Sequence, residues 1–317
     1  MRTPSKRNIL IIGSTGFIGR HLLRKLISLK QYNIFCLIRN PQAAVDSQFY
    51  GVKTILADIN DKNLSSKLRQ YDIGVIFHCA GYVGNKSPCL LNRINLKGTE
   101  NVCKLAIELN IERLVYLSSV AVVSGNQNIP LTEDLPFCAT NIYGESKLEA
   151  EKKVLEYRSK GLRAVILRPP MVYGPDEPHL SRLLLGLLKL RLLPLIKGAQ
   201  SRFHLVYVEN LVEAMIFVMD KESFLEGSFF VADEEILTTA QVFRAMARAI
   251  GAKDPFVLGR RLENIILGIP FVGKKLKFFT KDRVYSTQQI KALGFRCPYP
   301  ARESLIKSAK AIVLNNR

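Results

Sequence analysis

A tyrosine and a lysine four residues apart, Tyr143 and Lys147, are residues whose types and spacing suit proton transfer. On a helix, side chains four apart lie on one face, about 6 Å apart along the axis. A tyrosine phenol ordinarily has a pKa of about 10, and a neighbouring ammonium lowers that pKa. A tyrosine tuned in this way can exchange a proton with a secondary alcohol while a nicotinamide exchanges hydride with the same carbon. The alternative interpretation is a chance pair on a solvent-facing helix.

Two serines, Ser118 and Ser119, follow the apolar run 113–117, and Ser119 precedes Tyr143 by 24 residues. A hydroxyl at the C-terminal end of a parallel strand lies at the edge where open α/β sheets bind their ligands. We therefore expect Ser119 to bond the reacting oxygen and to hold it beside Tyr143. The alternative is a pair of ordinary strand-end serines.

Three glycines within seven residues, Gly13, Gly16 and Gly19, connect an apolar run to an amphipathic stretch. Glycine permits a tight turn, close approach of a pyrophosphate to the backbone, and close packing of helix on strand. The N-terminus of the next helix presents free N–H groups and a positive dipole end to phosphates. Because the glycines lie between a predicted strand and a predicted helix, they indicate a dinucleotide-binding turn, although the spacing differs from GxGxxG. A tight turn without a ligand is the alternative.

The residue that ends the second predicted strand, Arg39, bears on which dinucleotide binds. It stands twenty residues past Gly19. At this place an acidic residue would bond the ribose 2′-hydroxyl, whereas an arginine pairs with a 2′-phosphate. Arg39 therefore favours NADP(H) over NAD(H), unless it is simply an exposed strand-end arginine. Asp58, after the third predicted strand, is expected to bond the adenine amino group or, alternatively, to cap a helix beginning near residue 61.

The elements that must position these residues alternate along the first 170 residues. Short apolar runs predict strands at 9–12, 34–38, 54–56, 75–78, 113–118 and 163–167. Helical patterns lie between them at 18–30, 62–70, 94–109 and 143–160. Strands that are apolar throughout and separated by helices predict a Rossmann-type doubly wound parallel sheet, which belongs to the α/β class.

The second half of the chain has a different pattern. Prolines become frequent after residue 167, and helical patterns dominate at 180–192, 209–220, 239–250 and 256–268. We predict an NAD(P)-binding Rossmann domain over 1–172 and a smaller, mainly helical substrate lobe over 173–317. Residues 204–220 are expected to return to the Rossmann core. Ligands of open α/β sheets bind in crevices at the C-terminal ends of the strands, where we expect the lobe to lie.

Composition narrows the class of protein. With 317 residues, of which 48% are hydrophobic and 23% charged, the chain is expected to be globular rather than disordered. The six cysteines are scattered without a CxxC pair, which favours reduced thiols over a disulfide framework or a metal site. We see no signal peptide and no window of the about 18 apolar residues that span a bilayer. These observations favour a cytoplasmic protein.

The formal charge of +19 is concentrated near the C-terminus. Residues 244–317 hold 16 Lys/Arg and 4 Asp/Glu, which gives +12 in that segment. Such a field attracts phosphate-bearing ligands, anionic membranes or nucleic acid, although it can also serve solubility alone. Because no nucleic-acid-binding motif is present, we expect no nucleic-acid partner. Contact of 256–283 with an anionic membrane is a further hypothesis.

The chain resembles the extended short-chain dehydrogenases/reductases of the NAD(P)-dependent epimerase/dehydratase family. The matching motifs occur in the family's order and span about two thirds of the chain. They are GSTGFIG at 13–19, ADI at 57–59, FHCAG at 77–81, NLKGTENV at 95–102, LSS at 117–119, YGESK at 143–147, LRPPMVYGP at 167–175 and LVYVENLVEAM at 205–215.

The resemblance implies a Rossmann core with NAD(P) bound across the strand tips. Tyr143 would be the acid/base, Lys147 its tuner and a ribose ligand, and Ser119 the hydroxyl that positions the substrate oxygen. The residues 79–81 would line the adenosine and ribose side, and 169–172 would pass under the nicotinamide. The full set of implied cofactor contacts is Gly13, Thr15, Gly16, Phe17, Ile18, Gly19, Arg39, Asp58, Ile59, Cys79, Ala80, Gly81, Ser118, Tyr143, Lys147, Pro169 and Val172.

Two departures from the family pattern bear on the substrate. Ser124 stands near the place where many sugar-acting members carry a tyrosine, and the segment 201–210 lacks the Arg-Asp pair of many nucleotide-sugar members. The pattern is nearer to dihydroflavonol-reductase-like and 3β-hydroxysteroid-dehydrogenase-like members. It implies an NADP(H)-preferring oxidoreductase that acts on an uncharged secondary alcohol or ketone.

Two other functions remain open at this point. One is a nucleotide-sugar epimerase, dehydratase or reductase, which the basic C-terminal segment would suit by holding a diphosphate. The other is a non-catalytic dinucleotide-binding subunit. In the enzyme interpretations, substrate specificity is expected in 82–94, 124–142 and 174–203. A homodimer through helices near 95–110 and 143–160 is common in such folds.

Overall fold

The computed structural model describes residues 6–42, 51–84, 87–178, 181–221, 226–259, 261, 263, 265, 268–269 and 280–314. The chain divides into two compact units. The first comprises Met1–Asn126, Glu133–Pro169 and Val212–Phe230, and the second comprises Gln127–Thr132, Pro170–Leu211 and Val231–Arg317. The sequence led us to expect a boundary after residue 172 and a return over 204–220.

The first unit is built on a seven-stranded sheet in which every neighbouring pair is parallel. The strand order is β10-β6-β5-β4-β1-β2-β3. The strands are β1 (Arg7–Ile12), β2 (Tyr32–Ile38), β3 (Lys53–Leu56), β4 (Val75–His78), β5 (Arg113–Leu117), β6 (Ala164–Arg168) and β10 (Ser228–Phe230). The expected Rossmann-type doubly wound fold is confirmed.

The chain leaves β1 toward β2 and later crosses back to β4 on the other side of β1. This reversal of strand order opens a crevice at the C-terminal ends of β1 and β4, where doubly wound sheets bind dinucleotides. The expected strands lie within one or two residues of the observed ones. β10 was not expected, because three residues are too few for a recognisable pattern.

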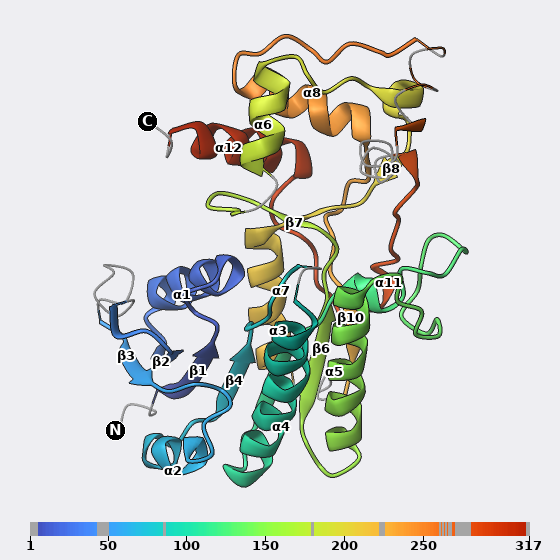
Figure 1. Ribbon diagram of the computed structural model, residues 1–317. Coiled ribbons are helices and arrows are strands. Elements are labelled where there is room, and N and C mark those ends of the chain that lie inside the picture. Colours follow the sequence, from blue (N-terminus) through green and yellow to red (C-terminus); the bar gives the residue numbers. More distant parts are fainter. Residues whose placement is uncertain are drawn as a thin grey trace. The chain divides into compact units, whose positions relative to one another are not determined.

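Helices cover the sheet of the first unit on both faces. α4 (Gly98–Glu108) and α5 (Ile142–Arg158) pack against each other (Figure 1). α1 (Phe17–Leu29) is tied to α7 (Val208–Asp220) by an ion pair between Lys25 and Glu213. The shorter elements are α2 (Leu64–Leu68), η3 (Arg69–Tyr71), α3 (Pro88–Leu90), the π-helix η4 (Leu91–Lys97) and η5 (Val120–Val122).

The core explains why the strands show no polar alternation. Leu10 and Ile12 of β1 pack in one cluster with Val102 of α4 and Val154 of α5. Ile9 and Ile11, which point to the opposite face, are also completely buried. Because both faces of the sheet are covered, every position of its central strands favours an apolar side chain.

The second unit is mainly helical, with two small sheets of two strands each. β7 (Val172–Tyr173) pairs with β9 (Val206–Tyr207), and β8 (Arg202–Phe203) pairs with β11 (Leu237–Thr238). Its described helices are α6 (Ser181–Lys189), η6 (Ile196–Ala199), α8 (Thr239–Ala249), α11 (Gln288–Ala292) and α12 (Ala301–Leu314). The helices expected at 180–192, 209–220 and 239–250 match α6, α7 and α8. The one expected at 256–268 lies partly outside the described residues.

Among the helices described, none is long and apolar enough to cross a membrane.

Candidate active site and dinucleotide pocket

The three glycines of the first turn have different tasks. Gly13 has φ +91°, and a Cβ at this position would lie 2.6 Å from the backbone nitrogen of Ala80. A Cβ on Gly19 would collide with the carbonyl oxygen of Gly13. These two glycines therefore let α1, β1 and the segment after β4 pack closely. Gly16 is less crowded, since a Cβ there would meet only the Gly13 carbonyl, at 3.3 Å.

Gly16 is also the N-cap of α1 and provides no side-chain cap for its free N–H groups. The first turn of α1 holds no acidic residue. Uncapped N–H groups and the positive end of the helix dipole attract an anion at this point. The turn therefore fits a pyrophosphate, and the binding of one at this turn stays a prediction.

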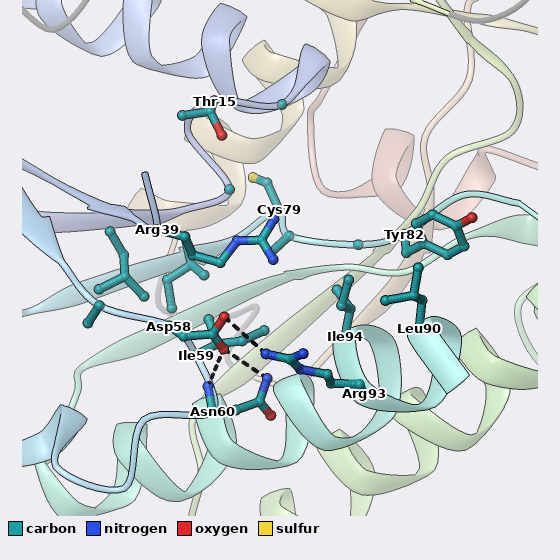
Figure 2. A pocket seen from close by; sticks show the side chains of 17 residues that line it. Thr15, Arg39, Asp58, Ile59, Asn60, Cys79, Tyr82, Leu90, Arg93 and Ile94 are labelled. Atoms are coloured by element: carbon teal, nitrogen blue, oxygen red, sulfur yellow. Dashed lines mark hydrogen bonds and ion pairs between the residues drawn. The ribbon is translucent and has the colours of Figure 1, made fainter. Parts of the chain in front are cut away.

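A cavity of about 260 Å³ opens beside this turn. Its walls come from the C-terminal ends of β1, β2, β3 and β4 and from helices α3 and η4, which Figure 2 shows from close by. The lining residues are Ile12, Gly13, Thr15, Gly16, Leu37, Arg39, Ala57, Asp58, Ile59, Asn60, Cys79, Ala80, Gly81, Tyr82, Leu90, Arg93 and Ile94. Apolar walls with a few charged groups at one end are typical of a site for a dinucleotide.

The charged end of the cavity holds two guanidinium groups. Figure 2 shows the side chains of Arg39 and Arg93 extending into the cavity from different elements. The Arg93 guanidinium lies 3.8 Å from the Asp58 carboxylate. The other oxygen of Asp58 accepts hydrogen bonds from the backbone and side-chain nitrogens of Asn60, at 2.8 and 2.9 Å. The alternative role of Asp58 as a helix cap is wrong, because α2 begins at Leu64 after an Asn63 N-cap.

Tyr143 and Ser119 are brought together at the start of α5. Burial raises the pKa of the Tyr143 phenol, and hydrogen bonding to Ser119 acts in the opposite direction. The Ser119 hydroxyl oxygen accepts a hydrogen bond of 3.2 Å from the backbone nitrogen of Ala121. That bond uses the oxygen as an acceptor and leaves the hydroxyl proton for donation toward the phenol oxygen.

Lys147 is buried one turn after Tyr143 on the same helix. Its ammonium donates a hydrogen bond of 2.7 Å to the carbonyl of Leu117 and lies 4.8 Å from the centre of the Tyr116 ring. A Cβ on Gly81, which lines the cavity, would lie 3.8 Å from Lys147 Nζ. Burial lowers the pKa of Lys147 to about 8, while the Glu151 carboxylate acts in the opposite direction. The ammonium is thus mostly charged at neutral pH and borders the cavity.

A second group on α5 continues the same helical face. Glu151 is fully buried and accepts hydrogen bonds from the Ser118 hydroxyl at 2.5 Å and from Arg168 at 2.5 and 2.9 Å. Lys147 and Glu151 therefore hold two consecutive residues of the β5 end, Leu117 and Ser118. These contacts fix the backbone immediately before Ser119. The Ser118 hydroxyl points into this network rather than into the cavity.

The π-helix η4 connects the cavity wall to the beginning of α5. Asn95, fully buried within it, accepts a hydrogen bond of 2.7 Å from the Tyr82 backbone nitrogen and donates 3.1 Å to the Tyr82 carbonyl. The same amide donates 2.9 Å to the Ser146 hydroxyl, which in turn donates 2.7 Å to the Tyr143 carbonyl. π-helical turns are frequent at functional sites. Here the wider turn carries an amide that links the cavity to the tyrosine.

Of the residues expected to contact the cofactor, nine line the cavity: Gly13, Thr15, Gly16, Arg39, Asp58, Ile59, Cys79, Ala80 and Gly81. The others lie elsewhere. Phe17, Ile18 and Gly19 belong to the first turn of α1, Pro169 follows β6, and Val172 is in the second unit. Burial raises the pKa of the Cys79 thiol to about 12, so it contributes an uncharged wall.

Sequence reasoning missed several groups that shape the site. Arg93, Tyr82 and Asn60 line the cavity, and Asn95 and Glu151 hold its neighbours in place. Two of these residues had a signal in the sequence. Asn95 is the first residue of the motif NLKGTENV, and Glu151 stands four residues after Lys147, on the same face of the predicted helix. The described residues contain no cluster of His, Cys, Asp or Glu that could hold a metal ion, and all six cysteines are free.

Known proteins share this architecture. Residues 9–232 match the model of the NAD dependent epimerase/dehydratase family. A UDP-glucose 4-epimerase of Vibrio cholerae is 27% identical, with 98% of this chain and 97% of the relative covered. A decarboxylating sterol-4-alpha-carboxylate 3-dehydrogenase of Schizosaccharomyces pombe is also 27% identical, with 87% and 86% covered.

Solved structures agree on the fold. The crystal structure of a Thermus thermophilus UDP-glucose 4-epimerase in complex with NAD superposes with a TM-score of 0.75 at 24% identity. The comparison covers 96% of this chain and 99% of that one. The fold is thus shared over nearly the full length of both proteins.

Proposed function

The chain belongs to the NAD dependent epimerase/dehydratase family, and on this premise we propose that it is an NADP(H)-preferring oxidoreductase that interconverts a secondary alcohol and a ketone. It is an enzyme of the extended short-chain dehydrogenase/reductase type. The proposed reaction rests on the convergence of Ser119, Tyr143 and Lys147. They lie where β5 ends and α5 begins, beside a cavity with a turn that fits a phosphate.

The cavity residues fit a nicotinamide dinucleotide. The uncapped N-terminus of α1 at Gly16 would hold the pyrophosphate, and Asp58 would bond the adenine. Arg39 would pair with a ribose 2′-phosphate, which is the feature that separates NADP(H) from NAD(H). When bound, the nicotinamide supplies the hydride chemistry.

The chain's own residues move and hold the proton. Tyr143 takes the proton of the alcohol oxygen in the oxidative direction and returns it in the reductive direction. Ser119 donates a hydrogen bond that keeps the reacting oxygen beside the phenol. The Lys147 ammonium, one turn from Tyr143, would stabilise the phenolate electrostatically. From its place behind Gly81 it would contact the ribose. Because Ser118 is bonded to Glu151, the structure favours Ser119 for the role beside Tyr143.

The substrate class rests on the segment 201–210. His204 is buried and bonded to the carbonyl of Asp233 at 2.7 Å, and Asn210 is buried and donates to the Asp233 carboxylate at 2.8 Å. These polar side chains thus stabilise the second unit itself, and the segment carries no Arg-Asp pair for a diphosphate. This supports an uncharged alcohol or ketone as the substrate. The sterol-4-alpha-carboxylate 3-dehydrogenase relative supports a dehydrogenase that needs no nucleotide sugar, although its own substrate carries a carboxylate.

A nucleotide-sugar epimerase is the second candidate. The UDP-glucose 4-epimerase relative matches over nearly the whole chain, and the +12 charge of residues 244–317 would suit a diphosphate.

A homodimer through the helices near 95–110 and 143–160 and a cytoplasmic location remain predictions from the sequence.

The substrate class has a direct test. With NADP⁺ present, we expect an uncharged secondary alcohol such as a 3β-hydroxysteroid to produce reduced cofactor, measured as absorbance of the reduced nicotinamide. We expect UDP-, GDP- and dTDP-sugars to leave the melting temperature unchanged, since a ligand that binds only the folded state raises it. Stabilisation by a nucleotide sugar, with no oxidation of uncharged alcohols, would favour the epimerase instead.

The cofactor preference depends on Arg39. We expect the wild type to bind NADPH more tightly than NADH, and Arg39→Ala to weaken NADPH binding while changing NADH binding little. Loss of a charged hydrogen bond costs about 1.5–3 kcal/mol, which corresponds to roughly a ten- to hundredfold weaker Kd. Calorimetry with both cofactors measures this, and Arg69→Ala, an exposed arginine outside the cavity, is the control. Equal affinities of the wild type for both cofactors would overturn the preference.

A further inference from the structure

We propose that a corner of the second unit, formed by Lys189, Leu190, Arg191 and Leu192 together with Phe256 and Val257, binds the surface of an anionic lipid bilayer. We call these six residues the basic-apolar corner. The sequence suggested a membrane contact over 256–283, and two of the six residues, Phe256 and Val257, lie within that segment. It does not require the proposed redox reaction to be correct, because binding to lipid is measured without substrate or cofactor.

The corner exposes apolar side chains to an unusual degree. Leu190 is 68% exposed, Leu192 63%, Val257 57% and Phe256 42%. Seven of the sixteen exposed large hydrophobic side chains among the described residues lie within 183–192 or 256–269. Exposed apolar side chains that gather on one surface mark a site for a partner or a membrane.

The exposed residues are held in place rather than left on a loose loop. Arg191 has φ +57°, and its backbone nitrogen donates a hydrogen bond of 3.1 Å to the Leu188 carbonyl. A hydrogen-bonded turn therefore ends α6 at this point. Leu188 and Leu193, on either side of the exposed run, are buried. The four residues between these two anchors are all exposed.

Backbone pairing brings the second part of the corner beside the first. The Leu195 nitrogen donates to the Phe256 carbonyl at 2.8 Å, and the Leu258 nitrogen donates to the Leu195 carbonyl at 3.0 Å. Leu195 and Leu258 are buried, which anchors both segments. Phe256 and Val257 are therefore fixed beside Leu195, which follows the exposed Leu192 by three residues, although the two segments are distant in the sequence.

The charges of the corner select an anionic partner. Lys189 and Arg191 alternate with Leu190 and Leu192, and in the described part of the chain neither cation has a carboxylate within ion-pair distance. Asp254, the acidic residue closest in sequence to Phe256, is already paired with Arg248 at 2.7 Å. Phe256 and Val257 also belong to the basic segment 244–317, whereas Lys189 and Arg191 precede it in the sequence. Cations beside apolar side chains are the composition that holds proteins at the interface of anionic membranes.

A lipid surface fits these features better than the other partners. In a symmetric dimer the same cationic corner would face its own copy, and like charges repel. Nucleic acid would use Lys189 and Arg191 but would leave the exposed leucines and Val257 in water. A bilayer interface accommodates both the apolar side chains and the cations. The leucines and Phe256 would enter the acyl boundary, and the cations would contact headgroup phosphates.

Co-sedimentation with vesicles tests the inference. The full-length protein, free of substrate and cofactor, is mixed with phosphatidylcholine vesicles with and without phosphatidylserine. We expect binding to require phosphatidylserine and to weaken at least about tenfold in Lys189→Glu/Arg191→Glu. Lys62→Glu/Arg69→Glu changes the net charge equally at exposed positions of the first unit and is expected to weaken binding far less.

A second pair of variants separates insertion from simple charge attraction. We expect Leu190→Gln/Leu192→Gln to lose the part of the binding that survives high salt, whereas Ile107→Gln/Leu314→Gln, at other exposed positions, keeps it. The proposal is overturned if anionic vesicles are not bound, if both charge-reversal pairs lose binding equally, or if the leucine pair has no effect. It is also overturned if the corner variants change the mass of the protein in solution, which would identify the corner as a contact between copies.

Discussion

Replacing Tyr143 by phenylalanine is expected to lower the rate of hydride exchange by about 10²- to 10⁴-fold, the usual contribution of a positioned acid/base. The phenylalanine ring keeps the shape of the side chain but cannot take or return a proton. The change removes only the hydroxyl that Ser119 faces and leaves the cavity-lining residues untouched. Cofactor affinity is therefore expected to change much less than the rate. Stopped-flow absorbance of the reduced nicotinamide measures the rate, and fluorescence titration measures the affinity.

Tyr157→Phe is the matched control for this prediction. Tyr157 lies on the same helix, α5, and is buried in the core, whereas Tyr143 is partly buried. Its hydroxyl is far along the helix from the phenol of Tyr143, so its loss is expected to leave the rate close to that of the wild type. A Tyr143→Phe enzyme that turns over at the wild-type rate would remove the proposed mechanism. A variant that no longer binds the cofactor would show that Tyr143 serves the pocket and not the chemistry.

The parts of the fold that the sequence predicted well are those governed by local patterns. The run 9–12 followed by Gly13 predicts a buried strand and a tight turn whatever the distant context, and both are present. Tyr143 and Lys147 share a helix because four-residue spacing defines a face. Ser118 and Ser119 could be placed at a strand end because parallel strands finish at one edge of the sheet.

Features that depend on tertiary context could not be predicted from these local patterns. β10 pairs with β6 over only three residues and follows a long excursion of the chain through the second unit. The widened turn of η4 has no marker in the apolar spacing of 91–97. In the sequence, Arg93 is an ordinary basic residue of a predicted helix. Only the fold shows that it lines the same cavity as Arg39. The hydrogen bond between Ser118 and Glu151 likewise could not be inferred from sequence spacing alone.

Glu151 shows how the core and the site depend on each other. Its carboxylate is the common acceptor of Ser118 and Arg168, and Arg168 also donates 3.0 Å to the carbonyl of Glu133. Glu133 in turn accepts from the backbone nitrogen of Phe230 at 2.9 Å, which ties β10 to the network. The same carboxylate opposes the effect of burial on the pKa of Lys147. One buried charge thus supports the sheet edge and the ammonium beside Tyr143.

Replacing Glu151 by alanine is therefore expected to lower the free energy of unfolding by about 3–5 kcal/mol, since it leaves the Arg168 guanidinium buried and uncompensated. Urea denaturation measures the loss. The double variant Glu151→Leu/Arg168→Met removes both charges and is expected to regain most of the stability. Glu149→Gln, an exposed carboxylate on the same helix, is the control and is expected to cost much less.

Glu151→Gln isolates the effect of the Glu151 charge on Lys147, because glutamine keeps the shape of the side chain and removes its charge. Without the carboxylate, the pKa of Lys147 falls further below its present value of about 8, so the ammonium loses its proton at lower pH. Wherever activity needs that ammonium, the alkaline fall in rate must then begin at lower pH than in the wild type, while Glu149→Gln keeps the wild-type profile. A Glu151→Gln enzyme that is destabilised but has an unchanged pH profile would limit Glu151 to a role in folding. A shifted profile that the double variant Glu151→Leu/Arg168→Met shares would identify the carboxylate as the group that keeps Lys147 charged.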